Sequence, residues 1–390
     1  MAAELLSQCR GEGAFDHKLL EELVRTDSPE IFRGLVEPLC DAYDARLCEL
    51  YAEIFERVIW MVVPESQPRR AQTSTAWDGN PGEVCVLSRV TLGADVAVTS
   101  VILDAVKQRF PEAAIRLVGA RKNFELFDGD ERLTHLEAPY VRTASLRERL
   151  QASLRLRDAI PPRALVVDPD SRLTQLGLIP VCPKENYVFF EGRSYGGDSS
   201  ETITRLAQRW ALEVFGVGAS AYVAPSAVPA CEESGIVTVS LGVGENSAKR
   251  VGDAFEIGLV RALVGRGLRV LIDHGVGVEE AGRVDRAIAL SGAPPGQIRT
   301  WSGAFAPFAA AIARSRLYVG YDSSGQHVAA ACCVPLVTVF AGYPNERFRQ
   351  RWRPEGAGPI HVVTGDGALE QTMRAIDTLL EQPWGDSSSS

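Results

Sequence analysis

A short polar segment near the carboxyl-terminal end of the chain carries the residues best suited to chemistry: Asp322, Ser323, Ser324, Gly325 and His327. The apolar run 317–320 before it predicts a strand, and the small residues 327–333 predict a helix. A strand, a tight polar turn and a helix N-terminus form an anion site, because unpaired backbone N–H groups and the positive end of the helix dipole face the ligand. Asp322 would then accept hydrogen bonds from ligand hydroxyl groups, and His327 would donate one to a phosphate oxygen. A structural role fits equally well, in which Asp322 or Ser323 caps the helix and His327 fills space.

A second candidate loop, 241–250, also follows a predicted strand and opens a predicted helix. Its Gly242 and Gly244 lack the third glycine of a dinucleotide-binding fingerprint, and the spacing does not match a P-loop. The loop ends in Lys249-Arg250, a cation pair that could neutralise a diphosphate. The helix dipole disfavours cations at a helix start, so a merely solvated charge pair is a poor explanation. Something negative should compensate these charges, and an anionic ligand would do so.

A third candidate is Asp95, in the strand-to-helix turn Leu92-Gly93-Ala94-Asp95-Val96. A carboxylate at such a turn could act as a general base toward a hydroxyl group. From this segment alone a helix N-cap is the simpler interpretation.

Two Asp-x-Asp pairs, Asp128-Gly129-Asp130 and Asp168-Pro169-Asp170, have the form by which some enzymes hold a divalent metal. Both are short enough to arise by chance, and Asp and Gly are common in turns for backbone reasons. We interpret both as turns and expect no metal.

Composition narrows the classes of function. A chain of 390 residues suits two domains, and 46% hydrophobic with 23% charged residues is ordinary globular composition. The net charge of -9 argues against non-specific binding to nucleic acid or to an anionic membrane as the main task.

The sequence also predicts the compartment. No apolar run approaches the roughly 20 residues of a membrane-spanning helix, and the first residues lack the features of a secretory signal. The eight cysteines include no C-x-x-C pair, and five histidines are few for a metal cage. We therefore expect a cytoplasmic protein with free thiols and no metal.

Hydrophobic periodicity predicts two α/β halves behind a helical start. Helices are expected from about 15 to 60, and the polar stretch 64–82 is expected to be a linker. The predicted strands are 83–89, 114–118, 163–167, 235–241, 268–273, 317–320 and 336–340. The predicted helices that follow or separate them are 94–110, 200–215, 251–266, 279–290, 306–313, 327–333 and 368–382.

Strands alternating with helices imply parallel sheets with a ligand site at the carboxyl ends of the strands. We predict an α/β chain of two Rossmann-like domains with an N-terminal helical extension. The expected segments are 1–63 (helical extension), 64–82 (linker), 83–222 (N-terminal Rossmann-like acceptor domain), 230–365 (C-terminal Rossmann-like donor domain), 366–384 (a helix that could pack across both domains) and 385–390 (tail).

The three loops, in this order, resemble the heptosyltransferase-like glycosyltransferases of family 9, which have the GT-B fold of two Rossmann-like domains. The family pattern Asp-Thr-Gly-x-x-His-Leu-Ala-Ala-Ala is similar to 322–331, with Ser-Ser in place of Thr-Gly and the glycine displaced to Gly325. A Trp-x-Pro-x-Gly pattern is similar to 352–356, and a Leu-Gly-Asp-Val pattern is similar to 92–96 with one residue inserted. The resemblance extends from about Glu83 to Leu379.

The resemblance implies roles for particular residues. Asp95 would be the base that deprotonates the acceptor, and Lys249 would neutralise the departing diphosphate. Asp322 would hold sugar hydroxyls. The remaining residues implied on the donor side are Ser323, Ser324, Gly325 and His327 for phosphate, Gly242 in the loop that carries Lys249, and Glu279 with Glu280 for the ribose.

The implied function is an inverting, metal-independent transfer of a sugar, heptose being the family default, from a nucleotide-diphosphate sugar such as ADP-heptose. No cofactor is implied beyond this co-substrate. The acceptor would be a glycan, a lipid-linked molecule or a small molecule, with lipopolysaccharide core as the family default. No nucleic-acid partner is expected. Peripheral membrane contact stays open, as does whether the N-terminal helices bind a partner or self-associate. The alternatives are a sugar-nucleotide epimerase or hydrolase on the same fold, and a non-catalytic nucleotide-sugar-binding or assembly protein.

Overall fold

The computed structural model describes residues 1–11, 15–233, 235–244, 246–275 and 277–381. The predicted tail 385–390, the end of the predicted segment 366–384 and Glu245 of the loop 241–250 lie outside these residues. The chain divides into two compact units. Unit 1 comprises Met1–Phe124, Glu131–Ser220 and Pro344–Arg351; unit 2 comprises Glu125–Asp130, Ala221–Tyr343 and the chain from Trp352 onward.

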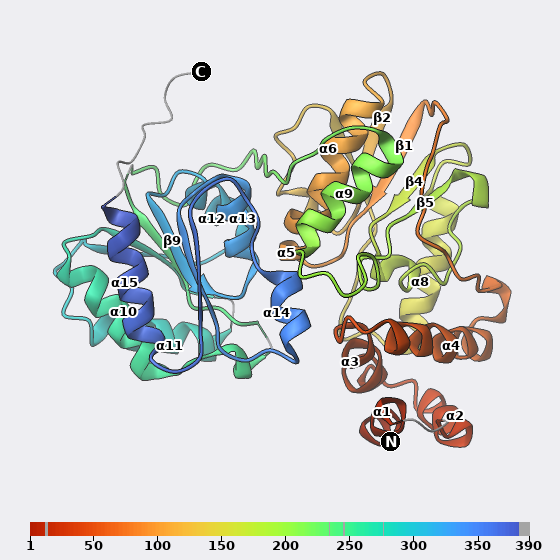
Figure 1. Ribbon diagram of the computed structural model, residues 1–390, viewed down its shortest axis with the longest axis horizontal. Helices are drawn as coiled ribbons and strands as arrows, with labels where there is room; N and C mark the ends of the chain where they lie inside the picture. Colours follow the sequence, from red (N-terminus) through yellow and green to blue (C-terminus); the bar gives the residue numbers. More distant parts are fainter. Residues whose placement is uncertain (12–14, 234, 245, 276, 382–390) are drawn as a thin grey trace. The chain divides into compact units, whose positions relative to one another are not determined.

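Unit 1 contains a five-stranded parallel sheet in the order β3-β2-β1-β4-β5. Its central strands are buried on both faces, as expected of a parallel sheet covered by helices (Figure 1). The strands are β1 (Glu83–Leu87), β2 (Ala114–Gly119), β3 (Leu133–Glu137), β4 (Leu165–Asp168) and β5 (Tyr187–Phe189). The other helices of this unit are α5 (Leu92–Ala94), α6 (Ser100–Arg109), α7 (Arg121–Phe124), α8 (Leu146–Ala159) and α9 (Ile203–Phe215), together with α14 (Glu346–Trp352) except its last residue.

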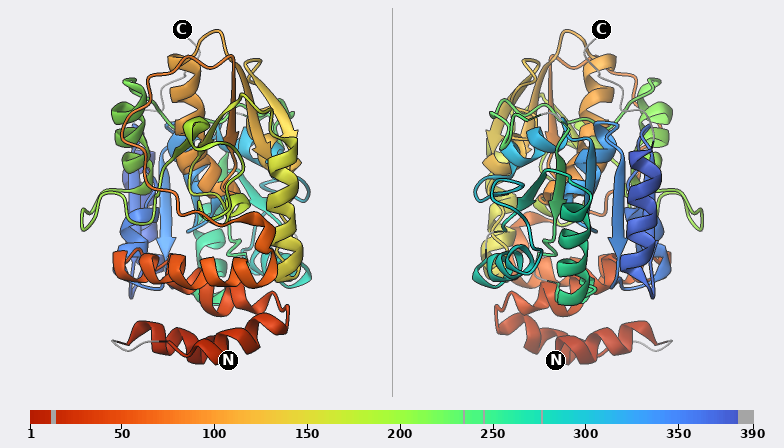
Figure 2. Two further views of the ribbon diagram at one scale, coloured as in Figure 1. Left: turned by 90° about the vertical axis from the view of Figure 1, so that its right-hand side faces the viewer. Right: turned by 90° about the vertical axis from the view of Figure 1, so that its left-hand side faces the viewer.

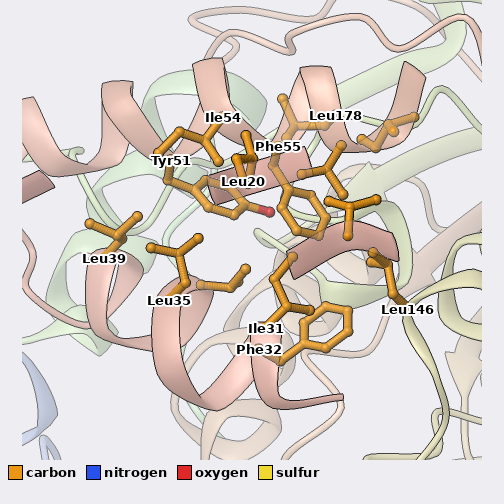
Figure 3. Close-up of a cluster of buried hydrophobic side chains, with 14 of the residues drawn as sticks. Leu20, Ile31, Phe32, Leu35, Leu39, Tyr51, Ile54, Phe55, Leu146 and Leu178 are labelled. Carbon is orange, nitrogen blue, oxygen red and sulfur yellow. The ribbon is translucent and has the colours of Figure 1, made fainter. Parts of the chain in front are cut away.

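The N-terminal helices share a hydrophobic core with this unit. They are α1 (Ala2–Arg10), α2 (His17–Arg25), α3 (Glu37–Cys40) and α4 (Ala45–Val62), with a π-helical turn at Phe32–Val36. Figure 2 shows them grouped at one end of the unit, next to α8. Tyr51 and Phe55 of α4 stack with ring centroids 5.4 Å apart, in a cluster that includes Leu178 (Figure 3). Each large side chain buried in this way stabilises the unit by about 1.5–3 kcal/mol.

The polar stretch 64–82 has no helix or strand beyond the 3-10 turn Pro64–Ser66, yet it is bonded along its length to unit 1. The backbone N–H of Arg69 donates to the Leu178 carbonyl (2.9 Å), and that of Ser74 donates to the Phe189 carbonyl (2.8 Å). The indole N–H of Trp210 donates to the Ser74 carbonyl at 2.9 Å. The stretch is therefore an extended segment that is hydrogen-bonded to unit 1 on the β5 side of its sheet.

Unit 2 contains a six-stranded parallel sheet in the order β11-β10-β9-β6-β7-β8. This is the order of a doubly wound dinucleotide-binding domain. The strands are β6 (Val237–Ser240), β7 (Val270–Asp273), β8 (Ile298–Trp301), β9 (Leu317–Tyr321), β10 (Leu336–Phe340) and β11 (Ile360–Thr364). The helices are α10 (Asp253–Gly265), α11 (Val278–Ala289), α12 (Phe305–Ile312), α13 (Ser324–Ala331) and α15 (Ala368–Leu380).

The predicted α/β class with two Rossmann-like domains is confirmed, and each predicted strand is present with ends shifted by no more than two residues. Two helix starts were wrong by three residues: α9 begins at Ile203, not Ser200, and α13 begins at Ser324, not His327, so Ser324 and Gly325 belong to the first turn of α13. The apolar face of α15 packs into the core of unit 2, and its predicted packing across both domains stays a prediction. Within the described part of the chain, no helix combines the length and apolar character needed to cross a bilayer.

Candidate functional site

The candidate loops of unit 2 meet where the strand order reverses. Chain order runs outward from β6 through β7 to β8 on one side, and from β9 through β10 to β11 on the other. β6 and β9 are neighbours, with Ser240 opposite Gly320. The loops that follow them, 241–250 and 322–324, therefore leave the sheet side by side. Open α/β sheets bind ligands at such a switch point.

Lys249 and Asp322 form an ion pair at this switch point. The Lys249 ammonium lies 2.6 Å from Oδ2 of Asp322 and 3.3 Å from the Asp322 carbonyl oxygen. The Asp322 side chain is 8% exposed, whereas that of Lys249 is 20% exposed. The Lys249 side chain is thus partly exposed, and the Asp322 carboxylate orients its ammonium group.

Gln326 and Thr338 form a buried polar cluster that orients the Asp322 side chain. The Gln326 amide donates to Oδ1 of Asp322 (2.7 Å) and to the Trp352 carbonyl (3.2 Å). The Thr338 hydroxyl donates to the Gln326 side-chain oxygen at 2.6 Å. Sequence reasoning missed Gln326 and Thr338. A signal for Gln326 is present in the sequence, because it is a polar residue one helical turn after Asp322. No such signal exists for Thr338, because it lies on another strand, β10.

His327 is buried beside this cluster, in edge contact with the Trp352 ring at 5.9 Å. Burial lowers the pKa of His327 to about 4, although the Asp322 charge opposes the shift. The imidazole is therefore neutral near pH 7. It could donate one N–H to a phosphate oxygen but would not supply a positive charge.

The first turn of α13 has no side-chain cap. Ser323 is the N-cap residue, but its side chain makes no capping hydrogen bond, and its hydroxyl lies 3.4 Å from the Tyr318 hydroxyl. The alternative in which Asp322 or Ser323 caps the helix is therefore wrong. A Cβ atom on Gly325 would collide with the buried Tyr318 ring, so only glycine allows this turn to pack so closely on the strand.

The cations of the loop 241–250 are compensated by protein carboxylates. Asp322 pairs with Lys249, and Arg250 pairs with Glu256 (2.8 Å) and Asp253 (2.5 Å). Glu256 is buried and also accepts from Arg283 at 2.9 Å. The expectation that an anionic ligand would compensate the Lys-Arg pair was therefore wrong: Asp253 and Glu256 of the adjoining helix α10 pair with Arg250, and folding brings the distant Asp322 to Lys249.

Gly242 and the predicted ribose contact lie at the carboxyl ends of β6 and β7. Gly242 closely approaches the carboxylate of Glu280, which also fills the space above Gly275. Glu279 is exposed on the first turn of α11. The structure thus brings Glu280, rather than Glu279, against the phosphate-side loop.

Asp95 lies in the other unit, at the corresponding switch point between β1 and β4. It is fully buried, and its carboxylate accepts hydrogen bonds from Ser88 Oγ, the Arg89 N–H, Thr99 Oγ1 and Asn123 Nδ2, each at 2.6 Å. Burial raises the pKa of Asp95, and these four hydrogen bonds oppose the shift. The site residues predicted for the donor side belong to unit 2, whereas Asp95 belongs to unit 1.

The two Asp-x-Asp pairs are occupied by internal partners. Asp168 accepts from Thr174 Oγ1 (2.6 Å) and the Tyr187 hydroxyl (2.5 Å), and Asp170 pairs with the buried Arg193 at 3.0 Å. Asp128 accepts from the Ser226 N–H (2.8 Å), and Asp130 accepts from the Tyr222 hydroxyl (3.0 Å). Across the described residues, no group of three or more Asp, Glu, His or Cys side chains is placed to hold a metal ion.

Comparison with known proteins agrees with this architecture. No protein-family model and no curated protein matches the sequence. Among solved structures, the chain is similar to a family 9 glycosyl transferase from Veillonella parvula, with a TM-score of 0.59 and 14% identity over 79% of this chain and 99% of that one. It is also similar to the E. coli heptosyltransferase WaaC with ADP-2-deoxy-2-fluoro heptose, with a TM-score of 0.56 and 14% identity over 77% and 99% of the two chains.

A third similar structure is E. coli ADP-heptose lps heptosyltransferase II, with a TM-score of 0.54 and 16% identity over 76% of this chain and 98% of that one. At such identities the similarity concerns the fold. The chain has the GT-B fold of two Rossmann-like domains, as found in family 9 glycosyltransferases and ADP-heptose heptosyltransferases.

Proposed function

We propose that this protein is a glycosyltransferase that moves a sugar from a nucleotide-diphosphate sugar to an acceptor hydroxyl. The proposal is supported by the shared fold and by the content of the switch point in unit 2. ADP-heptose is the first donor to test, because the similar E. coli heptosyltransferase WaaC has been solved with ADP-2-deoxy-2-fluoro heptose and with ADP.

The observation that carries the proposal is the Lys249–Asp322 ion pair in front of the uncapped first turn of α13. A diphosphate there would meet a partly exposed lysine side chain and the N–H groups of an uncapped helix N-terminus, both of which favour an anion. The Asp322 carboxylate would remain to accept hydrogen bonds from sugar hydroxyls. One small site therefore offers complementary groups to both halves of a nucleotide sugar.

In the proposed reaction the acceptor oxygen attacks the anomeric carbon from the side opposite the diphosphate, which inverts the configuration. The acceptor hydroxyl releases its proton to solvent water as the new bond forms. The bond from the anomeric carbon to the diphosphate oxygen breaks, and its electron pair leaves with the diphosphate. Lys249 and the α13 N-terminus stabilise this developing charge. Gly242 and Glu280 would face the phosphate and ribose side. The reaction is proposed to need no metal, which accords with the internal engagement of both Asp-x-Asp pairs.

The acceptor and the compartment are proposals as well. A glycan, lipid-linked or small-molecule acceptor fits the fold, with lipopolysaccharide core as the first choice for a test. We propose a cytoplasmic location, where nucleotide sugars are made.

The test is a thermal-shift and calorimetric screen of ADP-heptose, ADP, UDP-sugars and GDP-sugars against the wild type, Lys249→Ala and the control Lys184→Ala. A ligand that binds only the folded state raises its stability. Lys184 is exposed in unit 1, so its loss should leave binding unchanged. No binding by the wild type, or equal binding by all three proteins, would refute the donor site.

Turnover separates transfer from the alternatives. ADP release that requires an acceptor supports transfer, whereas equal release in water alone points to a hydrolase. Interconversion of the sugar without release of nucleotide points to an epimerase.

A further inference from the structure

We infer that Glu256 is a positioning residue of the donor site: its buried carboxylate fixes the sequence neighbours of Lys249 and Asp322 and so sets the geometry of that ion pair. The inference rests on the proposed function, because it concerns how the groups that would hold a nucleotide diphosphate are kept in place. Glu256 lies on the first turn of α10 and its side chain is 2% exposed. It therefore acts through other residues and not on the ligand itself.

The carboxylate of Glu256 accepts hydrogen bonds from three different elements of unit 2. Its Oε1 accepts from Arg250 Nε (2.8 Å), from the Arg283 guanidinium (2.9 Å) and from the Tyr321 hydroxyl (3.2 Å). Its Oε2 accepts from a second nitrogen of Arg250 at 3.0 Å. The pair with Arg250 is thus bidentate, and such a pair fixes orientation as well as distance.

Two of these partners adjoin the ion pair of the candidate site. Arg250 directly follows Lys249 at the end of its loop. Tyr321, the last residue of β9, directly precedes Asp322. The Lys249 ammonium and the Asp322 carboxylate, which lie 2.6 Å apart, are therefore each carried by a residue whose neighbour is bonded to Glu256.

Two further connections extend the network. The Tyr321 hydroxyl also accepts from the Val251 N–H at 3.3 Å, so the end of β9 is joined directly to the chain that follows the loop. Arg283 lies on α11, one helical turn after Glu280 of the candidate site. One carboxylate therefore connects the loop, the strand end and the helix that together form the candidate donor site.

Stability alone is a poor explanation for this cluster. Replacing a buried ion pair or triad with apolar residues is often neutral or stabilising, because removing charges from water offsets their attraction. A carboxylate on a first helical turn also interacts favourably with the helix dipole, but Asp253 on the same turn provides that effect as well. What the buried Glu256 adds is a directional connection among three elements.

The test is a double-mutant cycle between Glu256→Gln and Lys249→Ala, with ADP as the probe and calorimetry as the measurement. Glutamine keeps the size of the side chain, but it has one acceptor oxygen in place of two, and its amide group donates toward the arginines. Asp377→Asn is the matched control, because Asp377 pairs bidentately with Arg266 at the other end of α10 (2.7 and 2.8 Å).

We expect Lys249→Ala to weaken ADP binding by about 10–100-fold in the wild-type and Asp377→Asn backgrounds. In the Glu256→Gln background it should cost less than about threefold, because residues of one network are not additive. Glu256→Gln alone should weaken ADP binding by about tenfold. An equal cost of Lys249→Ala in all three backgrounds, measured per folded molecule, would overturn the inference, since a loss of stability alone does not change that cost.

Two other outcomes are also decisive. If the wild type binds neither ADP nor ADP-heptose, the proposed function has failed, and amide hydrogen exchange of residues 249–251 tests the positioning role by itself. Faster exchange in Glu256→Gln than in Asp377→Asn supports it, and equal exchange contradicts it. If Glu256→Gln does not fold, Tyr321→Phe removes the hydroxyl that links β9 to this network and takes its place in the cycle. A reduced cost of Lys249→Ala in Tyr321→Phe then supports the inference, whereas the full wild-type cost overturns it.

Discussion

The two switch points of this chain share a topology but differ in the burial and hydrogen bonding of their polar residues. In sheet 1, the five-stranded sheet of unit 1, the carboxylate of Asp95 is fully buried and saturated by donors from its own unit. In sheet 2, the six-stranded sheet of unit 2, the Lys249 side chain that pairs with Asp322 is partly exposed, and the neighbouring helix begins without a side-chain cap. One switch point is closed off by its own hydrogen bonds, and the other keeps an exposed cationic side chain beside an uncapped helix start.

This difference separates two uses of the same fold. A site whose polar groups all bond to one another contributes to stability and shape, because each of its groups has exchanged water for a protein partner. A site with a partly exposed ion pair and an uncapped helix start can gain further partners from a ligand. We therefore expect mutations at the first switch point to act on folding, and those at the second to act on ligand affinity.

The largest effect is expected from Asp95→Ala. It leaves several buried donors without an acceptor, each costing about 1–3 kcal/mol. We expect a loss of about 3–5 kcal/mol in the free energy of unfolding, measured by urea denaturation. Donor affinity per folded molecule should be unchanged. A loss below about 1 kcal/mol would contradict the view that this switch point is structural.

His327 gives the next largest effect, as a dependence of stability on pH. Its pKa falls from 6.5 to about 4 on folding. Above pH 6.5 the residue is neutral in both states; as the pH drops toward 4, the unfolded chain binds a proton that the folded chain refuses. Stability should therefore fall over this range, by at most about 3 kcal/mol from this residue. Denaturation of wild type and His327→Asn between pH 4 and 7.5 measures it, and equal slopes would refute the assignment.

Lys249→Ala is expected to act on binding rather than on folding. Loss of a charge-assisted hydrogen bond costs about 1.5–3 kcal/mol, or roughly 10–100-fold in the dissociation constant of a nucleotide diphosphate. Calorimetry measures this loss, with Lys184→Ala as the control. An equal loss in both variants would show that the effect comes from net charge.

The smallest effect should come from Ser323→Ala. Removing a bonded Ser N-cap typically costs about 1 kcal/mol, but Ser323 makes no capping bond. We expect a change in unfolding free energy of less than about 0.5 kcal/mol. A loss of 1 kcal/mol or more would mean that the helix start is capped in solution, and the contrast between the two switch points would weaken.

There is a physical reason why some strands could be predicted from the sequence and others could not. Strands in the middle of both sheets were predicted, because burial on both faces produces continuous apolar runs. The unpredicted strands β3, β5, β8 and β11 are the four outer strands of the two sheets. Outer strands are paired on one side, and mixed sequences such as Leu-Thr-His-Leu-Glu in β3 give no clear period.

The residues of the candidate site likewise divide into those that the sequence predicts and those that it does not. Asp322, Lys249 and Asp95 could be found because each lies in a polar turn between an apolar run and a helix. The residues that orient Asp322 could not, because Gln326 and Thr338 look like ordinary helix and strand residues until the fold brings them together. The neutral state of His327 likewise depends on burial.

By itself, the sequence determined the α/β class, the central strands, the order of the polar turns and the residue types at the strand tips, since these depend on local periodicity and turn chemistry. Only the tertiary structure decided which of those turns is saturated and which remains open. That outcome depends on distant donors and carboxylates, and no local pattern reports whether a lone pair is already occupied. The polar segment at Asp322 keeps its predicted place at an open helix start, whereas Asp95 is enclosed by four donors.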